Sequence, residues 1–256
     1  MSLSYQHITP ALARQTKLLM TDVDGTLTSA DDTISPAVFE TVLRLEESGV
    51  IVGLVSGRTL PELESLGHRL NISGPIIAEN GAIARLKVDG ELIELGYSRK
   101  PSMEALEKLM LLYPGSIRGR EDNAERLVDV VIHTDNVPRE ALIQHLEDVQ
   151  LVDSGYIMHL MPTGISKGNT LLELLGSVGH DGVSPEEVMV FGDSATDLSL
   201  FEIFPHSVLI PNPRLAPELT DDVQKAAAYI AGIPYGEGFV QVARYIADIR
   251  ADSGRS

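Results

Sequence analysis

The sequence predicts an α/β fold in which a mainly parallel sheet is covered by helices on both faces. Short apolar runs alternate with segments of helical spacing along most of the chain. Several of these runs are continuously apolar, as in residues 50–55 (VIVGLV), which is typical of strands buried on both faces. Helical segments between such runs are the crossovers that parallel neighbours require.

The first half of this sheet is expected to alternate strand and helix. Lys17–Thr21 is an apolar run that ends at Asp22, and Pro36–Ser48 has helical spacing that stops at Gly49. The next expected elements are a strand at Val50–Val55, a helix at Pro61–Leu70 and a strand at Pro75–Ala78.

The C-terminal part continues the same alternation. Its expected elements are strands at Val188–Phe191, Ser207–Ile210 and Ala226–Ile230, with helices at Asp197–Phe204 and Gly238–Arg250. Ligands of such sheets bind outside the carboxyl ends of the strands. Asp22, Ser56 and Asp193 each stand where an apolar run ends, so they converge on one rim if their strands are neighbours.

The middle of the chain predicts a separate α+β layer inserted into the sheet domain. The expected elements are a hairpin at Ala82–Leu95, helices at Ser102–Tyr113 and Pro138–Val149, and strands at Leu127–Thr134 and Tyr156–Met161. We therefore expect residues 1–82 and 161–256 to form the sheet domain and residues 83–160 to form the insert.

Composition limits the classes of partner. The 256 residues carry a formal charge of −17 and include no cysteine, which excludes disulfides and thiolate chemistry and argues against nucleic-acid binding and anionic membranes. No apolar run approaches the roughly 18 residues that a membrane helix needs, and no signal peptide is apparent. We expect a cytoplasmic protein, whose anionic ligands must meet local cations or a metal.

The segment Asp22-Val23-Asp24-Gly25-Thr26 is the strongest chemical signal. Two carboxylates in one cleft can divide roles, one ionised as nucleophile or metal ligand and the other protonated as general acid. Gly25 allows a tight turn, and Thr26 offers a hydroxyl to a bound oxyanion. The alternative is a turn with two solvated carboxylates. A calcium loop fails, because Thr33 stands at the twelfth position from Asp22.

Three further segments carry complementary groups. Asp193 and Asp197 follow a strand and suit a hard cation, or simply cap the next helix. The hydroxyl and backbone amides of Ser56-Gly57-Arg58-Thr59, before a helix, suit an anion, although Arg58 alone is equally typical of a surface. Lys167 supplies a cation, or is an exposed lysine at a helix start.

One pattern points to a different enzyme class. Gly164-Ile165-Ser166-Lys167-Gly168 fits G-x-S-x-G, the nucleophile elbow of serine hydrolases, and Asp193 and His206 follow in the matching order. No upstream glycine-rich oxyanion segment accompanies it, and it leaves Asp22 and Asp24 without a role. We keep it as a minor alternative.

Taken together, D-V-D-G-T, the Ser of S-G-R-T, the Lys of S-K-G and G-D-x-x-x-D resemble the four motifs of the haloacid dehalogenase superfamily of phosphohydrolases. The resemblance covers roughly residues 17–245. It implies a Rossmann-like parallel-sheet core with an inserted α+β C2 cap domain. The segments A-E-N-G-A and P-T-G-I-S-K-G on either side of the insert resemble those of subgroup IIB.

The resemblance also implies roles for individual residues. Asp22 would attack phosphorus, giving an aspartyl phosphate, and Asp24 would act as general acid and base. Thr26, Ser56, Gly57 and Lys167 would hold the phosphoryl oxygens, and Mg²⁺ would be bound by Asp22, Asp24 and Asp193 with Asp197 close by. Thr196 stands where the subgroup usually has Asn, which implies an altered rate or metal preference.

The substrate implied is a small phosphorylated metabolite, such as a sugar phosphate or a phosphorylated sugar acid. Candidate substrate contacts are Arg58, Asn80, Arg118 and Arg120, and the two arginines at 118 and 120 would suit a second anionic group unless they are solvated loop residues. A phosphomutase and a phospho-accepting sensor that does not turn over remain alternatives. The protein is expected to be a monomer or a homodimer.

Overall fold

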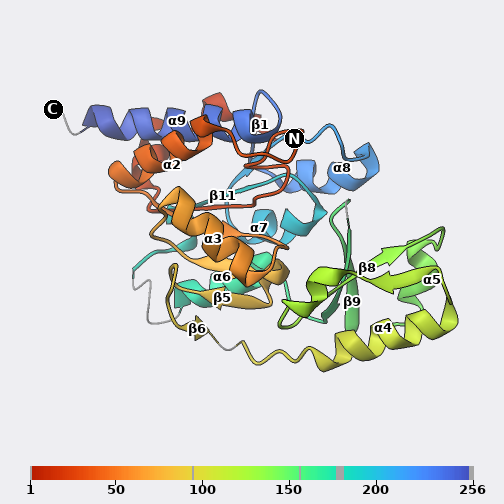
Figure 1. Ribbon diagram of the computed structural model, residues 1–256. Helices are drawn as coiled ribbons and strands as arrows, with labels where there is room; N and C mark the ends of the chain where they lie inside the picture. The colour runs from red at the N-terminus through yellow and green to blue at the C-terminus, as the bar shows by residue number, and fades with distance from the viewer. Residues whose placement is uncertain (1, 94, 156, 177–181, 254–256) are drawn as a thin grey trace.

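The computed structural model describes residues 2–93, 95–155, 157–176 and 182–253, which form two sheets with their helices (Figure 1). The larger sheet has the strand order β1–β13–β12–β11–β2–β3–β4–β5–β6. Neighbours from β1 to β4 are parallel, and β5 and β6 continue as an antiparallel hairpin. The predicted α/β fold with a mainly parallel sheet is confirmed.

Side chains of the central strands alternate between two apolar layers. On β2, Leu19 points into one core cluster, whereas Leu18 and Met20 point into the other. This alternation is why the central strands are apolar at every position. The strands are β1 Leu3–Ser4, β2 Leu18–Thr21, β3 Ile51–Val55, β4 Ile76–Ala78, β5 Ile83–Arg85, β6 Leu92–Ile93, β11 Val188–Gly192, β12 His206–Leu209 and β13 Tyr229–Ile230.

Helices bury their apolar stripes on both faces of this sheet. One face carries α1 Pro10–Gln15, α2 Pro36–Glu47, α3 Leu60–Leu70 and α9 Tyr235–Ser253. The other face carries α6 Lys167–Gly176, α7 Leu198–Ile203 and α8 Pro217–Ala226. None of the helices in the described part of the chain is long and apolar enough to cross a membrane.

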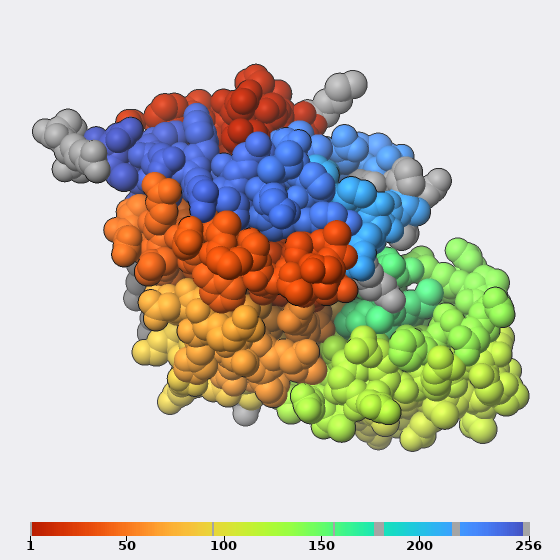
Figure 2. Space-filling view, turned by 45° about the horizontal axis from the view of Figure 1, so that its top comes forward, coloured from red at the N-terminus to blue at the C-terminus, as the bar shows by residue number. Residues whose placement is uncertain are grey.

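The smaller sheet is antiparallel, with the order β7–β8–β10–β9. Helices α4 and α5 pack on one of its faces around Leu109 and Leu142. Its elements are α4 Lys100–Leu112, β7 Ile117–Gly119, β8 Val130–Thr134, α5 Arg139–Ile143, β9 Val149–Asp153 and β10 Met158–Pro162. We call residues 100–162 the small-sheet lobe, which Figure 2 shows in yellow-green to green against the larger lobe.

The middle of the chain differs from expectation in its details. The helix expected at Pro138–Val149 ends at Ile143, because the next hydrogen bonds join residues three apart, from His145 N–H to Leu142 O and from Leu146 N–H to Ile143 O. Val149 then begins β9. Strand β7 was not expected, and Tyr156, in an expected strand, lies outside the described residues. The hairpin at 83–93 extends the large sheet, and the division at residues 83 and 160 stays a prediction.

Candidate active site

Three polar strand ends lie side by side at the carboxyl edge of the large sheet. Strands β11, β2 and β3 are parallel neighbours, and they are followed by Asp193, Asp22 and Ser56. All three side chains are buried. Because the strands are in register, these groups meet at one rim.

Lys167 is the buried cation at this rim. It is the first residue of α6 and is 1% exposed, and its Nζ lies 2.9 Å from Asp22 Oδ1 and 2.7 Å from Asp197 Oδ1. Burial alone would lower its pKa, but the charges and hydrogen bonds of Asp197 and Asp22 raise that pKa above its usual range. The ammonium group therefore keeps its charge inside the protein.

Asp197 fixes the position of the Lys167 ammonium group by accepting a hydrogen bond from it. While its Oδ1 accepts the lysine, its Oδ2 accepts backbone N–H groups from Asp193 and Ser194 at 3.0 and 3.1 Å. Both carboxylate oxygens thus have partners in the protein. This geometry fixes the turn after β11 and the position of the lysine together.

Asp193 is held by two side chains from other strand ends. Thr26 Oγ1 donates to its Oδ1 at 3.1 Å, and Asn212 Nδ2 donates to its Oδ2 at 2.5 Å. Gly25, with a φ of 81°, passes so close that a Cβ there would lie 2.3 Å from Asp193 Oδ2. Only glycine allows this approach of the first loop to the carboxylate.

Asp22, Asp193 and Asp197 form a buried acidic group that could hold a metal ion. One oxygen from each lies within 4.8 Å of the others. Burial raises the pKa of Asp22 to about 7 despite the opposing charge of Lys167. Burial, with the charges of Asp22 and Asp197, also raises the pKa of Asp193 well above its usual range. Three carboxylates against one ammonium leave a deficit of positive charge, and an all-oxygen donor set suits a hard divalent cation.

Asp24 lies above this group and is paired with Arg58. Arg58 Nε lies 2.9 Å from Asp24 Oδ2, and Arg58 Nη2 lies 2.5 Å from Asp24 Oδ1. The paired side chains of Arg58 and Asp24 are 28% and 43% exposed, so this pair faces the open side of the site. An incoming anion can compete with Asp24 for the guanidinium.

A cavity of about 710 Å³ opens above the rim, between the large sheet and the small-sheet lobe. Asn80 faces it with a left-handed φ of 56°, and its buried Nδ2 has no hydrogen-bond partner among the described residues. Thr196 also lines the cavity, with its hydroxyl oxygen 2.9 Å from Ser194 Oγ. The sequence-predicted residues that line it are Asp22, Asp24, Ser56, Gly57, Arg58, Asn80, Arg120 and Lys167.

The other expected residues lie elsewhere. Thr26, Asp193 and Asp197 are buried beneath the cavity, and the Thr26 hydroxyl is directed at Asp193. Arg118 is not among the described residues that line the cavity; it is exposed and pairs with Asp135.

The serine-hydrolase alternative has no geometric support. Ser166 Oγ accepts the backbone N–H of Asn169 at 3.2 Å, which makes it a cap of α6. His206 pairs in register with Met189 near the start of β11, whereas Asp193 follows the end of that strand. The G-x-S-x-G segment serves to place Lys167 instead.

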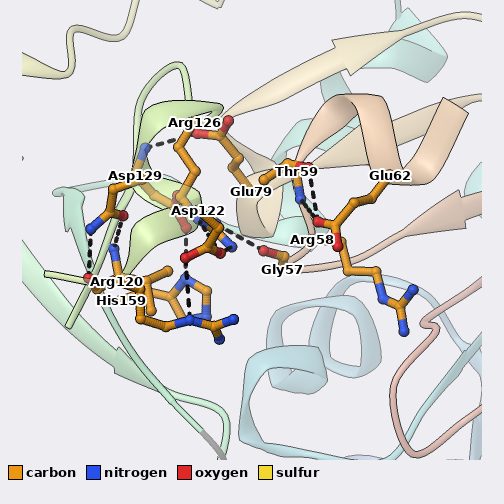
Figure 3. A network of polar contacts seen from close by, with 12 residues as sticks. Gly57, Arg58, Thr59, Glu62, Glu79, Arg120, Asp122, Arg126, Asp129 and His159 are labelled. Carbon is orange, nitrogen blue, oxygen red and sulfur yellow. Dashed lines mark hydrogen bonds and ion pairs between the residues drawn. The ribbon is translucent and has the colours of Figure 1, made fainter. Parts of the chain in front are cut away.

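Two groups of functional residues were not expected from the sequence. Asn212 follows β12, the neighbour of β11, so the rule that located Asp193 also applies to it. Glu79 and Arg126 join the small-sheet lobe to the large sheet (Figure 3). An acidic residue at the end of the apolar strand β4 was the available signal for Glu79.

Known proteins resemble this chain over most of its length. A family model described as haloacid dehalogenase-like hydrolase matches residues 19–113 and 116–241. A phosphoglycolate phosphatase of Methanoculleus marisnigri is 33% identical over 235 residues, which is 89% of this chain and 95% of that protein.

Solved structures share the fold. A crystal structure of a Thermoplasma acidophilum protein superposes with a TM-score of 0.79 at 26% identity, covering 91% of this chain and 99% of that one. A sugar phosphatase of haloacid dehalogenase subclass IIB has a TM-score of 0.70 at 17% identity, with 91% and 98% coverage, and so shares the fold.

Proposed function

Because this chain belongs to the haloacid dehalogenase-like hydrolases and is a phosphatase of a small phosphorylated substrate, we propose that it transfers the phosphoryl group to Asp22. The carboxylate oxygen forms a bond to phosphorus while the bond from phosphorus to the ester oxygen breaks. Water then attacks the aspartyl phosphate and releases inorganic phosphate. The observation that carries this proposal is Asp22 itself, at a strand end, beside Lys167 and facing the cavity.

Asp24 supplies the proton transfers in this scheme. It donates a proton to the leaving oxygen in the first step and takes one from the attacking water in the second. In this structure both carboxylate oxygens of Asp24 are occupied by hydrogen bonds from Arg58. A substrate anion that draws Arg58 away would leave the Asp24 carboxyl free to contact the leaving oxygen, so substrate binding and proton transfer are coupled.

The remaining polar groups bind the phosphoryl oxygens. Lys167 and the Ser56 hydroxyl lie at the rim, and Asn80 Nδ2 is a donor in need of an acceptor. We propose Mg²⁺ as the metal, held by the Asp22 and Asp193 carboxylates and the Asp24 backbone carbonyl, with Asp197 bracing Lys167. The metal supplies positive charge that polarises the phosphoryl group and offsets the buried carboxylates.

The substrate we propose is a short phosphorylated carboxylic acid such as phosphoglycolate. The name of the Methanoculleus marisnigri relative supports this choice. Arg120 of the small-sheet lobe lines the cavity with a partly exposed side chain and supplies a cation there. Sugar phosphates are the alternative. We further propose that the small-sheet lobe, which makes up most of the predicted insert at residues 83–160, forms a cap over the leaving group, and that the protein acts in the cytoplasm as a monomer or homodimer.

Phosphate release from a panel of substrates tests this function. The panel contains 2-phosphoglycolate, 3-phosphoglycerate, glucose 6-phosphate and an aryl phosphate, each with Mg²⁺ and with EDTA. We expect Mg²⁺-dependent release, fastest with a phosphorylated acid. Release unaffected by EDTA would contradict the metal assignment, and a preference for glucose 6-phosphate would contradict the substrate class. A phosphoaspartate that persists for hours would indicate a sensor.

Gly25→Ala tests the packing of the first loop against Asp193. The new Cβ would lie 2.3 Å from Asp193 Oδ2 and 2.5 Å from Asn212 Nδ2, so the carboxylate must move. We expect the Mg²⁺ concentration for half-maximal activity to rise about 10- to 100-fold, as for lost ligand-orienting contacts. Gly115→Ala is the matched control, because Gly115 has a φ of 79° with nothing within 4 Å of a Cβ. Equal effects of both substitutions would contradict the assignment of Asp193.

A further inference from the structure

A buried polar clamp joins the small-sheet lobe to the large sheet. The residue that the large-sheet domain contributes to this clamp is Glu79, which follows β4 and is fully buried. The Glu79 carboxylate accepts three successive backbone N–H groups, from Leu127 at 2.7 Å, Val128 at 2.8 Å and Asp129 at 2.9 Å. These donors meet the hydrogen-bonding needs of a carboxylate that water does not reach.

Arg126 extends this clamp to the loop of residues 56–59. Its side chain is 2% exposed, and Nη1 donates to the Gly57 carbonyl oxygen at 3.0 Å (Figure 3). The guanidinium is gripped by two carboxylates of its own lobe, Asp129 at 2.7 Å and Asp122 at 2.9 Å. The Arg126 guanidinium is therefore held in one orientation by its own lobe, and it donates a hydrogen bond across to the loop that follows β3 of the large sheet.

A second contact fixes the Asp129 carboxylate that grips Arg126. His159 Nδ1 lies 2.6 Å from Asp129 Oδ2, and the imidazole lines the cavity. Through His159, strand β10 thus fixes the Asp129 carboxylate that binds Arg126. This network reaches the loop after β3 through the Gly57 carbonyl, and it includes neither Asp22 nor the Ser56 and Lys167 side chains that we propose as phosphoryl ligands.

The Gly57 carbonyl and the Arg58 N–H belong to the same planar peptide group, and this group contacts the Ser56 side chain. The same plane carries the Arg58 N–H, which donates to Ser56 Oγ at 3.3 Å. Holding the carbonyl with Arg126 therefore directs this N–H at the serine oxygen. The serine then keeps its own O–H free to donate to a phosphoryl oxygen.

We propose that Arg126 is a positioning residue: when the lobe is clamped by Glu79, it orients the Gly57–Arg58 peptide and thereby the Ser56 hydroxyl. The phosphoryl site is complete only with the lobe docked. The proposal rests on the proposed function where it takes Ser56 as a ligand of the phosphoryl group.

A double-mutant cycle with Ser56→Ala tests the route through Ser56. Arg126→Lys keeps the charge but cannot reach the carbonyl and both carboxylates with one nitrogen. We expect it to lower kcat/KM for an aryl phosphate about 10- to 100-fold in the wild-type background, and less than about threefold in Ser56→Ala. An aryl phosphate has no carboxylate, so recognition of an acid group does not contribute. The same fold loss in both backgrounds would overturn the proposal.

Amide hydrogen exchange gives a readout that does not depend on turnover. Arg126→Lys should speed exchange at the Arg58 amide and leave the amides held by Glu79 protected, whereas Glu79→Gln should speed both. Arg139→Lys is the matched control, because Arg139 donates to Leu151 O within the small-sheet lobe, and it should change neither. Unchanged exchange at Arg58 in both test variants would overturn the proposal.

These arms separate the two hypotheses. A wild-type protein that hydrolyses no member of the panel would contradict the proposed function, and exchange at Arg58 would still decide the role of Arg126. Glu79→Gln does not alter the pairs of Arg126 with Asp122 and Asp129. If Arg126→Lys does not fold, Glu79→Gln replaces it in the double-mutant cycle with Ser56→Ala. Its loss of kcat/KM is also expected to disappear in the Ser56→Ala background.

Discussion

Replacing Asp22 with asparagine is expected to reduce Mg²⁺-dependent phosphate release by on the order of 10⁴- to 10⁶-fold, the range seen when a catalytic residue is removed. An amide oxygen is a poor nucleophile, and no other carboxylate takes its place. Asp24 is held by Arg58, and Asp197 by Lys167 and two backbone amides. Asp193 is held by the side chains of Thr26 and Asn212. The measurement is phosphate release with the preferred substrate of the panel.

Stability measurements show whether this variant is folded. Burial raises the pKa of Asp22 from 3.8 to about 7, so the folded protein keeps this carboxyl protonated to a higher pH than the unfolded chain does. In EDTA the contribution of the protonated Asp22 carboxyl to the free energy of unfolding is present below pH 4 and is lost as the pH rises through about 7. The neutral amide of the Asp22→Asn variant has no such loss, so above pH 7 the metal-free variant should melt at or above the temperature of the wild-type protein. Added Mg²⁺ should stabilise the wild-type protein more.

Asp222→Asn is the control for this substitution. Asp222 is exposed, pairs with Lys225 and is not among the described residues that line the cavity. We expect its activity and its response to Mg²⁺ to match those of the wild-type protein. Asp22→Asn protein that is folded yet retains a tenth of the wild-type rate would exclude Asp22 as the nucleophile.

The fold and the rim were predictable because both depend on local patterns. A strand buried on both faces must be apolar along its length, so the polar residue that ends it stands out. Asp22, Ser56 and Asp193 were found in this way, and adjacent parallel strands bring them together. Asn212 obeys the same rule, but the P-N-P segment around it lacks the carboxylate or hydroxyl that drew attention to the others.

The contacts of the small-sheet lobe could not be predicted, because they depend on how two separate layers dock. Glu79 meets amides about 50 positions away, and nothing local to Leu127 indicates a buried carboxylate. Charge alone also pointed to Arg118 as a cavity residue. In β7 the side chains alternate, so burying Ile117 turns Arg118 outward, while Arg126 enters the core network.

The net charge of −17 indicates that an anionic substrate must meet locally placed cations. In the structure, the cations near the cavity are each already bound to carboxylates. Lys167 is surrounded by carboxylates, and Arg58 and Arg126 are each bound to at least one. Binding an anion therefore means exchanging one acceptor for another. Such exchange favours ligands of the right shape over anions in general.

Lys167→Met is expected to lower the free energy of unfolding in EDTA by about 3–5 kcal/mol, the range for breaking a buried ion pair. The methionine fills the space of the lysine stem but leaves Asp22 and Asp197 without a cation. Phosphate release should fall by about 10²- to 10³-fold, as when one donor to a developing charge is removed. Denaturant unfolding with and without Mg²⁺ measures the first effect, and Mg²⁺ should recover part of the loss.

A second substitution distinguishes charge from packing as the cause of that loss. In Lys167→Met/Asp197→Asn the amide oxygen can still accept the backbone N–H groups of Asp193 and Ser194, while one unpaired charge is gone. We expect the double variant to be more stable than Lys167→Met and still inactive. Lys225→Met, at an exposed pair with Asp222, should leave stability unchanged. If the double variant is less stable than Lys167→Met, the buried charge imbalance is not what limits stability, and the argument for a compensating cation at this rim fails with it.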